Sequence, residues 1–214
     1  MRTVNQPQWS VLPPSVDEIE RFLAAQREAN FSYREIGASE GGAPVGYNVD
    51  HNRVRLGSGA ADFEAGCVAL KEWRMFPSPW TRITPRVAPI VVGQVVAMQA
   101  NALGLWWLNA CRIVYVLEEK TGDSRPGEDS SRHTPVRRFG FAYGTLQAHV
   151  EQGEERFSIE LLVDGSVWYD LRAFSRPRFW PVRLAKPLAR SLQRRFVRES
   201  LAAMQRAVRG SVAI

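Results

Sequence analysis

The segment LAKPLARSLQRRFVRESLAAMQRAV, at residues 184–208, decides the fold. Apolar side chains recur in it every three or four residues over about seven turns of helix. They are Leu184, Leu188, Leu192, Phe196, Val197, Leu201, Met204 and Val208, with most of the arginines between them. Because this spacing puts the apolar residues on one side of an α-helix, the segment predicts a long C-terminal helix at 184–209 with one face to bury.

The residues before this helix alternate with the period of two that is typical of β-strands. One alternating series lies at 110–117, a second at 139–149 and a third at 157–163, and Asp164-Gly165 then gives a strong hairpin signal. A helix that follows antiparallel strands buries its apolar face on their sheet. We therefore predict an α+β fold in which a curved antiparallel sheet wraps around the C-terminal helix.

The rest of the chain predicts a single domain over 1–214, because no internal repeat or linker divides it. Ser15 to Glu18 has the spacing of a capping box, which predicts a helix at 15–30. Asp62 is expected to cap a second helix that ends before Pro77. Residues 1–14 are expected to be flexible, and the polar segment 120–135 to form an exposed loop.

Targeting and metal-binding signals are not found in the sequence. It has neither the apolar core of a signal peptide nor the roughly 20 apolar residues of a membrane-spanning helix. Cys67 and Cys111 lie in apolar patterns without the spacing of a metal site, so we expect two buried thiols. These features predict a cytoplasmic protein that binds no metal and needs no cofactor.

Several motifs resemble those of one family. They are GYNVD (46–50), RVRLGSG (53–59), GLW (104–106), NACRI (109–113), FGFAYGTLQAHVEQGEERF (139–157) and AFSRP (173–177). With the last helix they cover roughly residues 30–205, and they are similar to a bacterial member of uncharacterised protein family 0548, a domain of unknown function also found in plants. The resemblance implies a START-like, helix-grip fold with a cavity between sheet and helix. It implies no catalytic residues, because fold alone does not fix function.

Aromatic and polar side chains alternate with small ones over residues 139–149, and such a mixture is typical of a mostly apolar pocket wall. The preceding strands add two tryptophans in sequence, of which one should face the pocket, and an arginine that either pairs with a carboxylate or meets an anionic ligand. The alternative for the 139–149 row is the wetted outer face of a strand. We predict these ligand-binding residues: Phe139, Phe141, Tyr143, Thr145, Gln147, Trp106, Arg112 and Tyr115.

The densest polar cluster is His149 with Glu151, Glu154 and Glu155. An enzyme could use His149, Tyr143, and Glu151 or Glu154 as acid–base groups. The alternative is an acidic hairpin connection, and the spacing matches no zinc template. No nucleophile-elbow, zinc-protease, redox or nucleotide-binding motif occurs, so the residues define no reaction.

The net charge of +6 is concentrated in the tail, where ten Lys or Arg and a single acid follow from Arg176 onward. Such arginines usually form the solvated side of a packed helix. An anionic membrane surface that contacts Arg190, Arg194 and Arg198 is an alternative, and nonspecific attraction of nucleic acid is another. We predict first a protein that binds an apolar or amphipathic, lipid-like small molecule between sheet and helix. An enzyme of the same fold and a membrane-associated protein are the alternatives.

Overall fold

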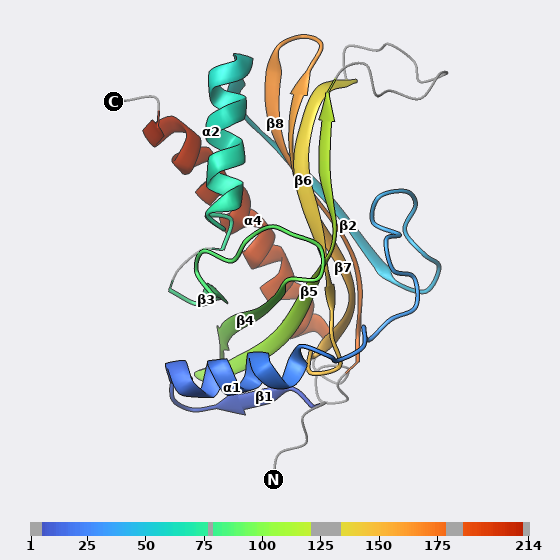
Figure 1. Ribbon diagram of the computed structural model, residues 1–214, viewed down its shortest axis with the longest axis vertical. Helices are drawn as coiled ribbons and strands as arrows, with labels where there is room; N and C mark the ends of the chain where they lie inside the picture. Colours follow the sequence, from blue (N-terminus) through green and yellow to red (C-terminus); the bar gives the residue numbers. More distant parts are fainter. Residues whose placement is uncertain (1–5, 77–78, 121–133, 179–185, 212–214) are drawn as a thin grey trace.

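The computed structural model describes residues 6–76, 79–120, 134–178 and 186–211 (Figure 1). The helices are α1 (Val16–Gln26), α2 (Gly59–Lys71) and α4 (Lys186–Ser211). The strands are β1 (Gln8–Ser10), β2 (Asn48–Ser58), β3 (Thr81–Thr84), β4 (Val95–Ala102), β5 (Leu105–Lys120), β6 (Pro135–Thr145), β7 (Glu151–Leu162) and β8 (Ser166–Pro177).

One curved antiparallel sheet organises the molecule. Its strands follow the order β2-β8-β7-β6-β5-β4-β3, and β1 pairs with β5 off this path. Helices α2 and α4 lie against one face, which we call the inner face, and the segment between α1 and β2 lies over the other, the outer face (Figure 1). This arrangement confirms the predicted α+β fold, with a sheet that grips the C-terminal helix.

The main core fills the space between the inner face and the two helices. Phe141, Phe157 and Leu171 from the sheet are fully buried there, together with Met204 and Val208 from the second half of α4. The apolar series in α4 therefore packs as its spacing predicts, because the residues share one side of the helix. Both cysteines are free and buried, as expected for structural thiols.

The capping box predicted for the first helix is present. The Glu18 amide donates to Ser15 Oγ at 3.3 Å, and the Ser15 amide donates to the Glu18 carboxylate at 2.8 Å. Helix α1 ends at Gln26, a turn earlier than the predicted boundary. Helix α2 begins at Gly59 rather than at Asp62, whose carboxylate reaches back to accept from the Ser58 amide at 2.8 Å.

Two predictions need correction. Within the N-terminal segment that was expected to be flexible, Gln8–Ser10 pairs with Trp106–Leu108 of β5. The strand predicted to run from 139 to 149 ends at Thr145, because the chain turns at Gln147 and the His149 amide donates to the Leu146 carbonyl at 3.2 Å. Leu184, the first residue of the predicted helix, and most of the 120–135 loop lie outside the described residues.

Candidate functional site

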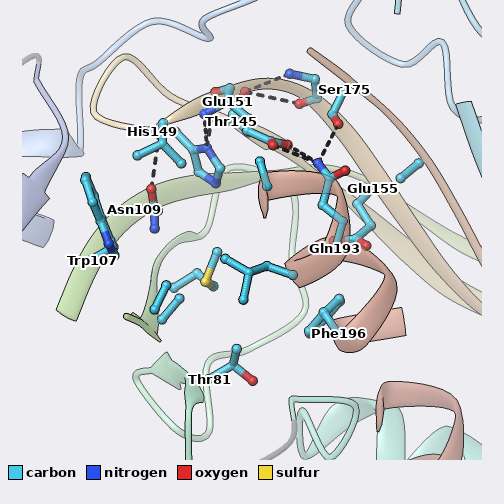
Figure 2. Close-up of a pocket in the computed structure, with 18 of the residues that line it drawn as sticks. Thr81, Trp107, Asn109, Thr145, His149, Glu151, Glu155, Ser175, Gln193 and Phe196 are labelled. Atoms are coloured by element: carbon cyan, nitrogen blue, oxygen red, sulfur yellow. Dashed lines mark hydrogen bonds between the residues drawn. The ribbon is translucent and has the colours of Figure 1, made fainter. Parts of the chain in front are cut away.

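A cavity of about 380 Å³ lies between the inner face and the first half of α4 (Figure 2). Three of the strand residues that line it, Ala100, Ala102 and Ala173, are small, whereas phenylalanines fill the core at the other end of the sheet. Leu192 and Phe196 of α4 close the cavity and are only partly buried. The alanines under the first half of α4 therefore leave space that the larger side chains around them do not fill.

A carboxylic acid faces the cavity from β7. Glu155 lies directly opposite Tyr143 in the β6–β7 ladder, and Tyr143 Oη donates to its Oε2 at 2.7 Å. Burial, with smaller contributions from the nearby acids Glu151 and Asp50, raises the pKa of Glu155 to about 7 against the lowering effect of the Tyr143 hydroxyl. Burial also raises the pKa of Tyr143 well above its ordinary value, so this side chain remains a hydrogen-bond donor. The pair combines a carboxyl group that is partly ionised at neutral pH with a protonated phenol.

His149 lines the same end of the cavity but is uncharged at neutral pH (Figure 2). Its Nδ1 lies 2.9 Å from the Glu151 amide nitrogen and 3.1 Å from the Glu151 carbonyl oxygen, so it accepts from the amide in one tautomer and donates to the carbonyl in the other. Burial, with a smaller contribution from the charge of Arg178, lowers the pKa of His149 to about 4 against the raising effect of its backbone contact with Glu151. A ring with so low a pKa is a weak base. No group of three potential metal ligands is found among the described residues.

Two polar contacts fix the first half of α4 to the sheet. The Arg190 guanidinium forms a bidentate ion pair with Asp50 of β2 at 2.6 and 2.9 Å. One helical turn on, the Gln193 amide donates to both Glu151 carboxylate oxygens at 2.7 Å (Figure 2). We call these two contacts the α4 latch, because they hold the helix over the cavity.

Glu154 is turned the opposite way, toward the outer face. Its carboxylate accepts from Tyr33 Oη at 2.7 Å, from the Gly37 amide at 2.8 Å, and from both the amide and the hydroxyl of Ser39. The contact with the Ser39 amide is 3.0 Å long. These bonds attach the loop that follows α1 to the outer face of the sheet, and Glu154 is a structural residue.

Residues 32–203 match the family described as "Domain of unknown function (DUF1990)". The chain belongs to this family. A protein of uncharacterised family UPF0548 from Dictyostelium discoideum is 32% identical over 212 residues, with 91% of this chain and 93% of the relative covered. A UPF0548 protein of Arabidopsis thaliana is 34% identical, with 78% and 76% covered, and one of Deinococcus radiodurans is 33% identical, with 87% and 91% covered. The resemblance predicted from the motifs is confirmed, and the family is not restricted to bacteria and plants.

Solved structures resemble the chain more distantly. The di-domain ARO/CYC StfQ from the steffimycin biosynthetic pathway is 9% identical with a TM-score of 0.47, covering 78% of this chain and 52% of that one. Ara h 8.0201 is 12% identical with a TM-score of 0.42, covering 77% and 99%. At these values neither likeness supports a comparison of function, and membership of the START-like superfamily stays a prediction.

Of the eight residues predicted to bind ligand in this DUF1990 chain, Tyr143 and Thr145 line the cavity. Phe139 and Phe141 face the same side but pack into the main core, beyond the end of the cavity. Gln147 lies in the turn after β6, where it accepts from Arg178 and donates to the Phe31 carbonyl at 3.0 Å. Phe139 and Phe141 miss the cavity because the aromatic core begins there, and Gln147 misses it because β6 has already ended.

The three predicted residues from β5 lie away from the cavity. Trp107 takes the cavity position, so Trp106 faces the other side, where the Arg82 guanidinium stacks 5.2 Å from its ring centre. Arg112 donates to the carbonyls of residues 26 and 27 at the end of α1, at 3.2 and 2.6 Å, so its guanidinium contacts the backbone there. A β-bulge between Ile113 and Tyr115 turns Tyr115 to the outer face, where it hydrogen bonds with Ser39.

Glu155 was not among the predicted catalytic candidates, although the sequence contained the signal that places it. Phe157 and Ile159 alternate on the inner face, so a residue two positions before Phe157 shares that face. By the same alternation, Glu154 points to the outer face. Asp50 and Gln193 could not be assigned in this way, because their contacts join elements more than 100 residues apart in sequence or depend on how α4 crosses the sheet.

The basic side of α4 is partly engaged. Arg190, predicted to contact a membrane surface, is paired with Asp50, while Arg194 and Arg198 are exposed. No helix in the described part of the chain is long and apolar enough to cross a membrane. Contact of α4 with an anionic membrane surface stays a prediction.

Proposed function

We propose that this protein binds an apolar or amphipathic small molecule in the cavity between the sheet and α4. The observation that carries the proposal is the cavity itself, with walls of Met98, Trp107, Leu171 and Leu192 and a few polar groups gathered at one end. Binding sites for small molecules are typically mostly apolar, with a few polar groups that orient the ligand.

The energetics of the cavity support the same proposal. Side chains around an unfilled apolar space lose dispersion contacts, so such a space lowers stability. A ligand that binds only the folded state adds stability as its concentration exceeds its dissociation constant. The latch fixes the first half of α4 over the cavity, and Phe196 of this half packs against Phe76 at the cavity edge, with ring centres 5.3 Å apart.

Two measurements test this function. Native mass spectrometry of protein purified without detergent is expected to show a bound molecule, and an apolar fluorescent probe is expected to bind the emptied protein. Ala173→Phe should abolish probe binding by filling the cavity, whereas Val68→Phe, at an exposed position of α2, should not. Ligand-free protein that does not bind the probe, or an Ala173→Phe variant that binds it as well as wild type, would overturn the proposal.

An acid–base enzyme of the same fold is the second candidate, and the Glu155–Tyr143 pair favours it. General acid–base groups work best with a pKa near the operating pH, which is where burial puts Glu155. His149, with its lowered pKa, is the weaker candidate. Wild type and Glu155→Gln can be compared in a small-metabolite extract. Conversion of a metabolite by wild type that the variant loses supports an enzyme, and equal conversion by both, or none by wild type, contradicts it.

A further inference from the structure

We propose that the cavity selects an amphipathic amine, an apolar body that carries one protonated amino group, and that this group pairs with the Glu155 carboxylate. This inference rests on the proposed binding function and specifies the class of ligand. It depends on the charges at the polar end of the cavity and on the partners that each charged group has.

The charged side chains that face the cavity are acids. Asp50, Glu151 and Glu155 line it, Glu154 is committed to the outer face, and His149 is uncharged at neutral pH. No Lys or Arg is among the lining residues within the described part of the chain. A fatty acid or a phosphorylated lipid would bring its negative charge toward these carboxylates, and like charges in a space of low dielectric constant repel strongly.

The three acids differ in the hydrogen-bond and ion-pair partners that their carboxylates have. Asp50 has the bidentate contact from Arg190, and Glu151 accepts from Gln193. Glu155 has Tyr143 on Oε2 as its hydrogen-bond partner in the described residues, and Oε1 remains for a ligand. An ammonium group carries three donors and a positive charge, so it can satisfy Oε1 and offset the cost of burying the carboxylate.

The titration of Glu155 should give ligand binding a pH dependence that packing alone does not produce. The ionisable groups around it are Tyr143 on β6, Glu151 on β7, Asp50 on β2 with its partner Arg190 on α4, and the uncharged His149. Cys111 on β5 and Tyr169 on β8 also interact with it, and burial raises the pKa of both, so they stay protonated. Because burial and neighbouring acids hold its pKa near 7, the carboxylate becomes fully ionised only above neutral pH. The affinity for an amine should therefore rise as pH increases through 7, while the affinity for a neutral alcohol should not.

The experiment compares three ligands of equal chain length, dodecylamine, dodecanol and dodecanoate, by competition with the apolar probe on the full chain. We expect the amine to bind at least about tenfold tighter than the alcohol, since a charge-assisted hydrogen bond contributes roughly 1.5–3 kcal/mol. Dodecanoate should bind more weakly than the alcohol. In Glu155→Gln the ratio of amine to alcohol affinity should fall to about one.

A second variant separates recognition from a structural effect. Tyr143→Phe removes the hydroxyl that lowers the pKa of Glu155, so the pH at which amine affinity rises should move upward. Dodecanol binding without preference for the amine, tighter binding of dodecanoate, or a preference retained by Glu155→Gln would each overturn this inference and leave the binding function standing. Absence of binding by all three ligands would overturn both.

Discussion

Two adjacent glutamates show how one step along a strand changes the role of a residue. Glu154 and Glu155 point to opposite faces of β7, because successive side chains of a strand alternate. Glu154 accepts four hydrogen bonds from the loop on the outer face, whereas Glu155 meets one tyrosine and the cavity. Glu154 therefore has a structural role, whereas Glu155 keeps one carboxylate oxygen for the proposed ligand.

Removing the charge of Glu154 should destabilise the protein. In Glu154→Gln an amide NH₂ replaces one carboxylate oxygen and faces the donors of Tyr33, Gly37 and Ser39. We expect a loss of about 2–4 kcal/mol in the free energy of unfolding, because buried donors lose a charged acceptor. Urea denaturation monitored by tryptophan fluorescence measures it. Glu40→Gln, an exposed position on the same loop, is the matched control and should change stability by less than about 0.5 kcal/mol. Equal values for the two variants would contradict the structural role.

At the scale of elements, β6 is shaped by its glycines on the outer face. A Cβ at Gly144 would lie 2.0 Å from Tyr33 Oη and 2.8 Å from Cζ, so the ring lies directly on the strand. Gly144→Ala should push the ring away and break its bond to Glu154, at a cost of about 1–3 kcal/mol. In a Tyr33→Ala background the same change should cost much less. Chemical denaturation of the four proteins of this double-mutant cycle gives the coupling, and additive effects would argue against the contact.

The two halves of helix α4 have different surroundings. Its second half is buried in the core through Met204 and Val208, while its first half spans the cavity and is held by the latch together with the partly buried Phe196. Arg190→Ala should therefore raise amide hydrogen exchange several-fold over residues 188–197, because an ion pair of this partial burial contributes about 1 kcal/mol to closure. Exchange around Met204 should not change. Arg194→Ala is the control, since that side chain is exposed, and a uniform increase along α4 would exclude a local latch.

The periodicity of apolar residues predicted the types and order of the main elements, because a helix or strand that buries one face carries its apolar residues at regular spacing. It predicted α4, the strands β5, β6 and β7 and the Asp164-Gly165 hairpin, with errors at the ends of the elements. It could not predict the bulge at Ile113 to Tyr115, which reverses the facing of all later residues of β5. It also extended β6 to His149, because the alternation of side chains continues through a turn fixed by distant contacts.

At the scale of the whole molecule, the candidate site was harder to predict than the fold. The fold follows from local patterns that each element carries alone, and the sheet can bury the apolar side of α4 in few ways. The site is made where β2, β6, β7 and α4 converge, so it depends on register and crossing angle. The alternation of side chains along β6 puts Tyr143 and Thr145 on the face where the cavity lies. The positions of Trp107, Asp50 and Gln193 required the three-dimensional structure.

Two of the groups with displaced pKa values, His149 and Glu155, should contribute opposing slopes to the dependence of stability on pH. Stability rises with pH wherever the unfolded chain binds more protons than the folded protein. His149, with a pKa lowered from 6.5 to about 4, meets this condition between those values, so its contribution grows as pH rises through that window. Glu155, with a pKa raised from 4.5 to about 7, does the opposite, and its contribution falls between 4.5 and 7.

Glu155→Gln isolates the second slope. Near about pH 5 the wild-type carboxyl group is protonated in the folded state and the variant should match it closely. Near about pH 8 the wild type must bury a charge that the variant lacks, so Glu155→Gln should be more stable by about 1–3 kcal/mol. Urea unfolding at both pH values measures the difference, with Glu40→Gln as the exposed control. A variant that differs from wild type equally at both pH values would mean that Glu155 titrates normally, and the amine selectivity proposed for the cavity would lose its pH dependence.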